Sequence, residues 1–463
     1  HARVPDDPAH WTNVFLAADA ALKWLQNRRL TPMRDAAIRR AERWILERMD
    51  PETTDGIGAI FPPMVYVQIA LRTLGYTRDH PVIRNAEHQL DRFFVEKEDH
   101  ARIQPCFSPV WDTGTGLYAI TEANLNVTND ERIARACEWL LDREVRINAD
   151  WHNTLRPKDR DVRVGPGGNA AAWSFEYRNE WYPDVDDSAM VTMALKRATI
   201  GARDTPVARR VEDAARRGVR WILAMQNDDG GWAAFDRTKD RPWMECVPFA
   251  DHNAMQDPSC ADITGRTIES LITNGLTPSH GAVVHAIDYL RNEQRPEGSW
   301  YGRWGVNFIY GTWQAVGGLA SAGEDTTQPY LKKTLDWLRS IQNDDGGFGE
   351  SANSYLDESR MGVGPSTPSQ TAWAVITLMH LTSARDESVT RAIEYLVGTQ
   401  LAEDTPADYP THPIDEPAGS WREEWFTGTG FPRVFYIRYH LYRHYFPMMA
   451  LARYLNVSRE SRG

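Results

Sequence analysis

Residues 221–232 read Trp-Ile-Leu-Ala-Met-Gln-Asn-Asp-Asp-Gly-Gly-Trp, and this stretch decides the fold because its pattern returns along the chain. An aromatic and an aliphatic residue end a helical segment, Gln follows after three further residues, and a glycine-rich turn leads to a second aromatic residue. Copies occupy residues 221–232, 289–300, 337–348 and, with a long insertion, 395–421, and weaker copies begin at Trp44 and Trp139. Internal repeats of this kind are typical of stacked structural units.

The repeat has a simple physical interpretation. A Gln near the end of one helix can bond free backbone groups at the terminus of the next helix, while the aromatic residue packs over its amide. Glycine lets the turn bend sharply. Apolar residues recur at helical spacing in runs such as 283–290 and 371–381, and strand-like alternation is rare. The predicted fold class is therefore all-α, with helix pairs that stack and close into an α/α barrel.

Composition excludes several classes of protein. The chain has 463 residues and a formal net charge of −12, so it lacks the basic surface of a nucleic-acid-binding protein. Its four cysteines form no Cys-x-x-Cys pair, and neither a disulfide framework nor a zinc site is predicted. The apolar runs fall short of the roughly 18 residues that a membrane-spanning helix needs. The 18 Trp, 17 Tyr and 14 Phe form an aromatic content that the function has to explain.

A cluster of carboxylates, Asp184-Val185-Asp186-Asp187, precedes a helical run at 188–195. We expect Asp187 or Ser188 to cap this helix. One acid is enough for a cap, whereas close like charges suppress ionisation and leave a neutral acid of the kind that general acid catalysis needs. Clustered carboxylates also suit Mg²⁺. The cluster alone leaves capping, acid catalysis and metal binding open.

Aromatic residues crowd the surrounding stretches, and each of them alone is more often part of a core than of a site. The set comprises Trp111, Phe175, Phe235, Trp304, Tyr310, Phe431, Phe435, Tyr439 and Tyr442. The last four have helical spacing, and we expect them on one face of a helix. Because π faces stabilise cations, a neutral acid beside them favours protonation of an alkene and control of carbocations in a water-free cavity.

At this point the chain resembles a known family, the squalene–hopene cyclases, which are bacterial class II triterpene cyclases. The repeats resemble the QW motifs of that family, and Asp184-Val185-Asp186-Asp187-Ser188-Ala189 resembles its DxDD motif. The other matching stretches are Ser-Pro-Val-Trp-Asp-Thr-Gly at 108–114, Gly-Ser-Trp-Tyr-Gly-Arg-Trp-Gly-Val-Asn at 298–307, Ser-Thr-Pro-Ser-Gln-Thr-Ala-Trp at 366–373 and Gly-Thr-Gly-Phe-Pro at 428–432. The resemblance covers nearly the whole chain.

The resemblance implies roles for individual residues. Asp186 would be the proton donor, flanked by Asp184 and Asp187, and the segment from Asp262 to Arg266 would support it. A cation at Arg266 would stabilise the conjugate base and so strengthen the acid. By the same resemblance, Tyr310 would help to reprotonate the acid and Phe249 would form the constriction at the substrate entrance. The other aromatic residues named above would line the cavity.

Two positions depart from the family pattern. Phe235 stands where a tyrosine is usual, which removes a hydroxyl group and keeps the π face. Phe61, in the segment Ile60-Phe61-Pro62 that resembles the place of the terminating water or base, stands where a glutamine is familiar. The last step, deprotonation to hopene or hydration to hopanol, is therefore open.

The resemblance also implies a domain organisation. Residues 1–105 are predicted to form part of a second α/α barrel and residues 106–463 the catalytic barrel. Family members carry a longer N-terminal region, and residue 1 is His rather than Met, so we expect a partial chain. Residues 11–25 have the apolar spacing of an amphipathic helix followed by basic residues, which fits either packing on neighbouring helices or a helix lying on a bilayer. The resemblance favours the bilayer.

The predicted function is that of an isomerase that cyclises squalene to hopene or hopanol, with no cofactor or metal. Its expected partners are squalene or a similar polyprenoid and a membrane surface, with a homodimer as an open alternative to a monomer and no nucleic acid. The expected location is peripheral, on the cytoplasmic membrane of a bacterium. The alternatives are a related cyclase that makes a tetrahymanol, onoceroid or meroterpenoid product, a non-catalytic lipid-binding toroid, and a metal-dependent terpene synthase, which would need a second carboxylate cluster.

Overall fold

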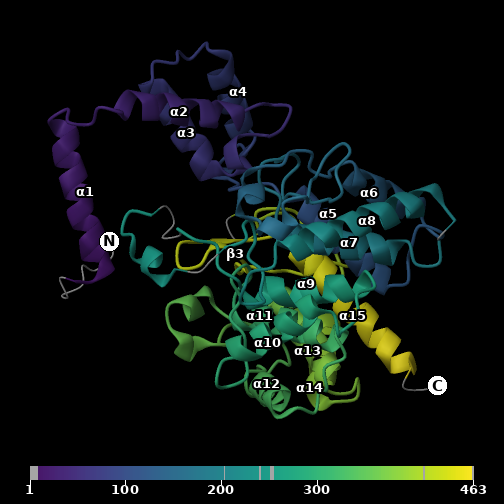
Figure 1. Cartoon of the computed structure of the whole chain (residues 1–463). Helices are drawn as coiled ribbons and strands as arrows, with labels where there is room; N and C mark the ends of the chain where they lie inside the picture. The colour runs from purple at the N-terminus through teal and green to yellow at the C-terminus, as the bar shows by residue number, and fades with distance from the viewer. Residues whose placement is uncertain (1–8, 203, 239–240, 251–254, 410–411, 461–463) are drawn as a thin grey trace.

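The structure is a computed structural model, and it describes residues 9–202, 204–238, 241–250, 255–409 and 412–460 (Figure 1). The expectation about the start of the chain falls on residues 1–8, which lie outside these ranges. The helices are α1 (Trp11–Asn27), α2 (Arg34–Glu47), α3 (Phe61–Thr73), α4 (Pro81–Asp91), α5 (Pro109–Glu122), α6 (Glu131–Leu141), α7 (Val185–Ala198), α8 (Pro206–Ala224), α9 (Ala261–Thr273), α10 (Gly281–Glu293), α11 (Phe308–Ser321), α12 (Pro329–Ser340), α13 (Pro368–Leu381), α14 (Glu387–Gly398) and α15 (Tyr442–Glu460). Two antiparallel hairpins pair β1 (Phe94–Glu96) with β2 (Ala101–Ile103) and β3 (Gly428–Phe431) with β4 (Phe435–Ile437).

Within the described residues, six helices form a closed ring. Each packs against the next in the order α5, α7, α9, α11, α13, α15, and α15 returns to α5 (Figure 1). The helices α6, α8, α10, α12 and α14 pack on the outside of this ring. This arrangement is an α/α barrel, and it confirms the predicted fold class.

The two sets of helices differ in which faces they bury. Ring helix α11 is buried from Phe308 to Leu319, because it has ring neighbours on both sides and an outer layer behind it. Outer helix α8 buries one stripe and exposes arginines on the other, as an amphipathic helix does. Glycine allows α9 and α11 to approach closely, since a Cβ at Gly265 would lie 2.1 Å from the carbonyl oxygen of Gln314.

The glutamines of the repeats act as predicted. Gln226 Nε2 donates hydrogen bonds to the carbonyl oxygens of Gly230 in its own turn and Ala282 in the first turn of α10, both at 2.8 Å. The equivalent bonds join Gln294 to the first turn of α12 and Gln342 to the first turn of α14. The second aromatic residue has a further role, since the indole of Trp232 donates to the carbonyl of Ile222 at 2.7 Å. These three repeats therefore each tie one outer helix to the next, whereas the amide of Gln400 in the fourth repeat bonds Gly419 in its own turn.

The weaker copy at Trp139 achieves the same connection with different chemistry. Trp173, far along the chain, donates its indole N–H to the carbonyl oxygen of Leu140 at 2.7 Å. Glu144 stands at the glutamine position and accepts a charged hydrogen bond from Arg217 of α8 at 2.6 Å. An ion pair thus replaces the amide bonds between α6 and α8.

The N-terminal helices form a smaller unit beside the barrel. A separate apolar core around Met64, Leu71 and Ile83 lies within residues 49–93, and the proposed boundary at residue 105 stays a prediction. Helix α1 stands away from this unit and contacts the 3₁₀ helix η4 (Pro242–Cys246), where Thr12 donates to the carbonyl of Cys246 (Figure 1). None of the described helices combines the length and apolarity that crossing a membrane requires.

The expectation that Phe431, Phe435, Tyr439 and Tyr442 share one helix is wrong. The first two lie on strands β3 and β4, and α15 begins only at Tyr442. Glycines prevent a helix here and admit the rings instead, because a Cβ at Gly430 would lie 2.1 Å from the ring of Phe435. The four aromatic residues reach one place through a hairpin and a helix start, not through helical periodicity.

Candidate active site

The carboxylate cluster forms the N-terminus of ring helix α7. Asp184 is the N-cap, and its Oδ1 accepts a hydrogen bond from the backbone N–H of Asp187 at 2.7 Å. The helix therefore begins at Val185, three residues before the expected run, and neither Asp187 nor Ser188 is its cap. The reason is that Asp184 is held in extended backbone by a bridge to Trp173, which places its carboxylate over the free N–H groups.

Asp186 is bonded to a buried arginine of the neighbouring ring helix. Arg266 on α9 donates from Nε to Asp186 Oδ1 at 2.6 Å and from Nη2 to the hydroxyl of Tyr310 at 2.9 Å. Its guanidinium carbon also lies 4.8 Å from the ring centroid of Trp111. Three ring helices, α7, α9 and α11, thus bring together residues that the sequence separates widely.

Two opposing effects set the acidity of Asp186. Burial raises the pKa of its carboxyl group above the ordinary value, while the charge of Arg266 lowers it and that of Asp262 raises it. Burial alone would lower the pKa of Arg266, but the charge of Asp186, together with Tyr310 and Glu269, raises it above the ordinary value, so the guanidinium keeps its proton. A carboxyl group in this setting is protonated more readily than in water, and its conjugate base has a fixed cation beside it.

Asp184 and Asp187 behave as one buried pair. Burial raises the pKa of both carboxyl groups, and the charge of Asp186 adds to the rise at Asp184 while that of Asp184 adds to the rise at Asp187, so at least one of the pair holds a proton near neutral pH. Within the described residues, Oδ1 of Asp187 is buried and has no hydrogen-bond partner. The side chains of the cluster point to different partners, and no group of three or more His, Cys, Asp or Glu in the described ranges is arranged as a metal site.

A cavity with about 930 Å³ of unfilled space, part of it open to solvent, lies against this cluster. Nine of the predicted aromatic residues line it with the three aspartates. The lining residues of these types are Asp184, Asp186, Asp187, Trp111, Phe175, Phe235, Trp304, Tyr310, Phe431, Phe435, Tyr439 and Tyr442. The structure therefore brings most of the predicted site residues to one hollow.

The aromatic walls are held in place by contacts with one another. Tyr439 and Tyr442 stack with ring centroids 4.4 Å apart, and the indole of Trp111 donates to the hydroxyl of Tyr442 at 3.2 Å. On another wall, Phe235 meets Trp304 edge to face at 6.1 Å. Fixed rings present their π faces at defined places, which is the requirement for stabilising a cation that moves through the cavity.

Asp262 occupies a supporting position. Its Oδ2 accepts from the backbone N–H of Trp304 at 2.8 Å, and its own chain neighbour Ile263 donates to Oδ1. Asp257 does the same for Phe235, accepting from its backbone N–H at 2.7 Å. Two buried carboxylates thus fix the backbone of one aromatic wall, and Asp262 acts on Asp186 through its charge.

Phe61 and Phe249 are not among the residues that line the cavity. The ring of Phe61 meets Phe94 of β1 and packs against the small N-terminal core, although its neighbours Ile60 and Pro62 do line the cavity. Phe249 is 60% exposed in a loop after η4. Their predicted roles in termination and at the entrance have no support in the positions of these side chains.

The lining includes polar residues that the sequence interpretation missed. Glu176 and Cys106 both line the cavity near Ile60 and Pro62, and Glu176 is only 7% exposed. Burial raises the pKa of Glu176 to about 8. The sequence did offer a signal for Glu176, because it directly follows Phe175 in an aromatic stretch that leads to Asp184. The sequence does not show, however, that Glu176 is buried.

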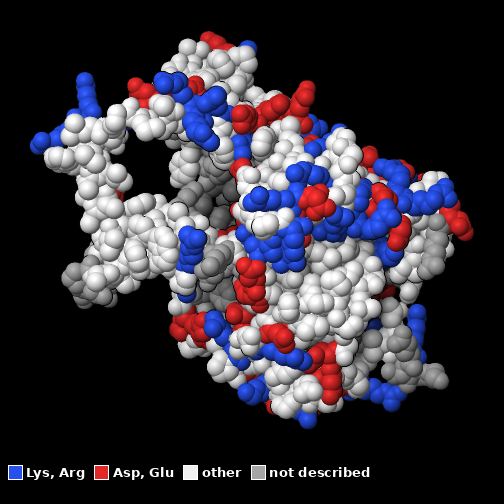
Figure 2. Space-filling view, viewed as in Figure 1, with Lys and Arg blue, Asp and Glu red and all other residues white. Residues whose placement is uncertain are grey.

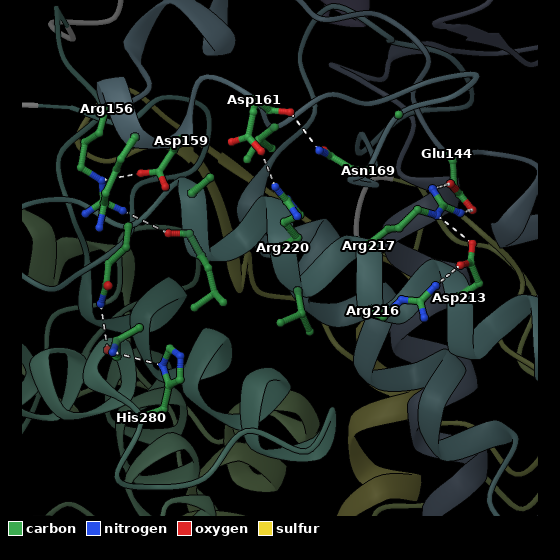
Figure 3. A pocket seen from close by; sticks show the side chains of 18 of the residues that line it. Glu144, Arg156, Asp159, Asp161, Asn169, Asp213, Arg216, Arg217, Arg220 and His280 are labelled. Carbon is green, nitrogen blue, oxygen red and sulfur yellow. Dashed lines mark hydrogen bonds and ion pairs between the residues drawn. The ribbon is translucent and has the colours of Figure 1, made fainter.

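A second, larger hollow lies on the outside of the barrel, over α8 and the start of α10 (Figure 3). It is rich in charged residues, and its arginines are matched by carboxylates: Arg156 pairs with Asp159, Arg220 with Asp161 and Arg217 with Glu144. Basic side chains that are already neutralised leave little net charge for a ligand. The aromatic cavity is the candidate active site.

Comparisons with known proteins agree with this geometry. The sequence model of the squalene-hopene cyclase C-terminal domain matches residues 107–456, and that of the N-terminal domain matches residues 1–99. Squalene–hopene cyclases of Bradyrhizobium diazoefficiens and Alicyclobacillus acidocaldarius are 40% and 41% identical, over 98% and 95% of this chain and 65% of each relative. Dammaradiene synthase of Dryopteris crassirhizoma is 36% identical over 96% of this chain and 64% of that protein. The chain spans just under two thirds of the length of these curated relatives, and it belongs to the squalene-hopene cyclase family.

Proposed function

We propose that this chain cyclises squalene to a pentacyclic hopanoid by protonating a terminal alkene. The observation that carries the proposal is the contact between Asp186 and Arg266 at the wall of an aromatic cavity, where a buried acid faces apolar space. A non-catalytic lipid-binding toroid would account for the aromatic lining but not for a buried acid–arginine pair in it.

The first step is the transfer of one proton from Asp186 to the alkene. The O–H bond breaks, the π electrons of the double bond form a C–H bond, and a tertiary carbocation and a carboxylate result. Arg266 stabilises that carboxylate through the bond at 2.6 Å, and Tyr310 holds the guanidinium on its other side. Because these groups are in place before the reaction, little reorganisation opposes the charge that develops.

The following steps move the positive charge along the folded substrate. Each ring closure consumes the π electrons of the next double bond, and the rings of Trp304, Phe431 and Phe435 offer π faces along the lining. An apolar cavity keeps water from capturing the early cations. The cascade ends when a proton is lost to give hopene or when water adds to give hopanol.

Incubation of the purified chain with squalene, followed by gas chromatography and mass spectrometry, tests the proposal. We expect a pentacyclic product from the native chain, undiminished by EDTA, and none from Asp186→Asn, which keeps the size of the side chain but cannot supply the proton. Circular dichroism and thermal melting check that the variant is folded. Full activity of Asp186→Asn would exclude its role as donor.

The same product analysis separates the related activities. The curated relatives include a dammaradiene synthase at 36% identity, so cyclases with other products share this sequence pattern. A tetracyclic, onoceroid or tetrahymanol product from squalene would assign the chain to one of these. Absence of any cyclic product, together with squalene binding by the folded chain, would favour the lipid-binding alternative.

We infer that helix α1 lies on a lipid surface, because it is apolar where it is exposed. Leu22 is 62% exposed and Trp24 52%, and Trp11 and Phe15 join Trp243 of η4 in one aromatic cluster. Figure 2 shows α1 as a mostly uncharged column with positive side chains where it leads to α2. Leu22→Glu with Trp24→Glu is expected to abolish flotation with anionic vesicles, whereas wild-type flotation of this variant would contradict the inference. A homodimer stays a prediction that light scattering measures.

A further inference from the structure

Glu176 lies between the aromatic cavity and a second, smaller hollow on its outer side. It lines the aromatic cavity, and it also lines a small pocket with Asp55, Gln89, Arg92 and Tyr177. Its side chain is buried, and Asn179 Nδ2 donates to its Oε2 at 3.2 Å. A carboxyl group in this position separates the aromatic cavity from this small pocket, whose lining also includes the apolar residues Ala59, Phe93 and Phe107.

The small pocket adjoins a polar hollow at the surface. Asp55 and Tyr177 line both the small pocket and a larger polar hollow whose other walls include Arg143, Arg178 and Glu180. The side chain of Asp55 is 26% exposed, and it lies 3.8 Å from Arg92. Solvent therefore reaches Asp55, which is adjacent to the outer side of Glu176.

On its inner side, Glu176 faces the carboxylate cluster. The charges of Glu176 and Asp184 act on Asp187, whose buried Oδ1 has no hydrogen-bond partner among the described residues. Asp187 and Asp186 are adjacent on the first turn of α7 and line the same cavity. A row of carboxyl groups thus leads from the solvent-exposed Asp55 through Glu176 to the acid.

We infer that Glu176 passes protons from Asp55 and the water around it to the Asp184–Asp187 pair, and so reprotonates Asp186 after each turnover. The inference rests on the proposed function, in which Asp186 loses one proton per cycle. In one cycle, an O–H bond of the Asp184–Asp187 pair breaks as an O–H bond forms on the Asp186 carboxylate. The Glu176 O–H bond then breaks toward Asp187, and a new O–H bond forms on Glu176 with a proton from the Asp55 side. No electron changes hands, and the proton comes from solvent water.

The neighbours of Asp186 on the other side do not offer this path. Arg266 keeps its proton, because the charge of Asp186 raises its pKa. The bonds in the structure connect Tyr310 to Asp186 only through this guanidinium, and Tyr310 is 1% exposed. Along these hydrogen bonds, the role in reprotonation that the family resemblance implies for Tyr310 would require a proton to pass a permanent cation, although Tyr310 and Asp186 also line the same cavity.

The electrostatics of Glu176 suit a relay. The groups that face it are Asn179 from its own loop, Asp184 and Asp187 from α7, Asp55 from the N-terminal unit and Cys106 from the segment before α5. Burial and the charges of Asp184 and Asp55 raise its pKa to about 8, and burial also raises the pKa of Asp55. A group with a pKa near the working pH both accepts and releases a proton readily.

Comparison of the first turnover with later turnovers tests the inference. Glu176→Gln keeps an acceptor for Asn179 but carries no exchangeable acid. Enzyme equilibrated at assay pH and mixed rapidly with squalene is expected to form its first product per active site at the wild-type rate, and then to turn over at least tenfold more slowly. Asp55→Asn is expected to show the same split to a smaller degree, because solvent in the neighbouring polar hollow is another source of protons.

The matched control is Asp112→Asn, another buried carboxyl group, which accepts hydrogen bonds from Ser108 and Tyr445 instead of facing a polar hollow. Its ratio of first-turnover to steady-state rate should equal that of the wild type. A Glu176→Gln variant whose two rates fall by the same factor, or whose steady-state rate is unchanged, overturns the relay.

A second measurement needs no substrate and separates this inference from the proposed function. Infrared spectroscopy in D₂O follows the carbonyl band of the protonated Asp184–Asp187 pair as its proton exchanges for deuterium. Glu176→Gln is expected to slow this exchange at least tenfold, and Asp112→Asn to leave it unchanged. Exchange at the wild-type rate in Glu176→Gln rejects the relay even if squalene is cyclised. Slowed exchange with no squalene product supports the relay and rejects the proposed substrate.

Discussion

Replacement of Arg266 by Gln tests the electrostatic basis of the proposed acid. In the native chain Arg266 donates one charged hydrogen bond to Asp186 at 2.6 Å and a second bond to Tyr310 at 2.9 Å. The charge of Arg266 lowers the pKa of Asp186, while burial raises it. Without the guanidinium the lowering effect disappears, so the pKa of Asp186 rises further and the acid becomes weaker.

The size of the effect follows from the bond that is lost. A hydrogen bond to a charged group contributes about 1.5–3 kcal/mol. An effect of this size corresponds to a rise of about 1–2 units in the pKa of Asp186. If the whole contribution is made to the carboxylate that forms in the transition state, kcat falls about 10- to 150-fold.

The assay is the rate of squalene cyclisation as a function of pH. A general acid works in its protonated form, so activity declines as pH rises through the pKa of Asp186. We expect this decline to begin at a higher pH in Arg266→Gln, with a lower maximum rate.

Arg453→Gln is the matched control. Arg453 is a half-buried arginine, bonded to Glu122 at 2.6 Å and to Tyr118 at 3.0 Å, and it does not line the cavity. It should lose stability and keep the wild-type pH profile below its melting temperature. An Arg266→Gln enzyme with the native rate and profile would refute the reasoning.

Three further outcomes are expected from the fold and its buried groups. Gly265→Ala places a Cβ 2.1 Å from a backbone carbonyl of α11, so it should lower the free energy of unfolding by about 3 kcal/mol or prevent folding. At Gly317 the nearest neighbour of a Cβ is a side-chain oxygen at 3.7 Å, so Gly317→Ala should be neutral or slightly stabilising. Urea denaturation measures the free energy of unfolding of both variants. Gln342→Ala removes a bond of 2.8 Å to Gly346 in its own turn and one of 2.9 Å to Ser388 of α14, and it should cost about 1–3 kcal/mol of stability. Gln400→Ala should cost less, because its amide bonds one carbonyl in its own turn; equal losses would count against the clamp. Burial raises the pKa of Glu176 to about 8 in the folded state, against an ordinary value of 4.5, so the folded state binds more protons than the unfolded state between these pH values. The stability of the wild type should therefore fall as pH rises through this window. Thermal melting of Glu176→Gln should show a weaker decline with pH, and an identical decline would be evidence that Glu176 ionises normally.

Several site residues could be predicted from sequence because their signal is local. The DxDD motif and the aromatic residues beside it are short patterns, and the cavity lining contains nearly all of them. Helix boundaries were harder to predict from sequence, because the start of α7 depends on a bridge between Asp184 and Trp173, which lies earlier in the chain. The hairpin at 428–437 was not predicted, because the spacing of the aromatic residues suggested a helix. That spacing does not show that the ring of Phe435 packs against Gly430, where a Cβ would not fit.

The sequence by itself determined that helix pairs repeat and that each repeat ends in a glutamine able to join its neighbour. It could do so because the aromatic residue, the glutamine and the glycines of a repeat lie close together in the chain, although the carbonyls that the glutamines bond on the next helix are 36 to 56 residues away. Only the tertiary structure decided which carboxyl groups meet. The pairing of Asp186 with Arg266 depends on the packing of α7 against α9. The burial of Glu176 depends on its place between the aromatic cavity and the N-terminal unit. The pKa values of these carboxyl groups depend on burial and on charged neighbours distant in sequence, and a local sequence pattern predicts neither.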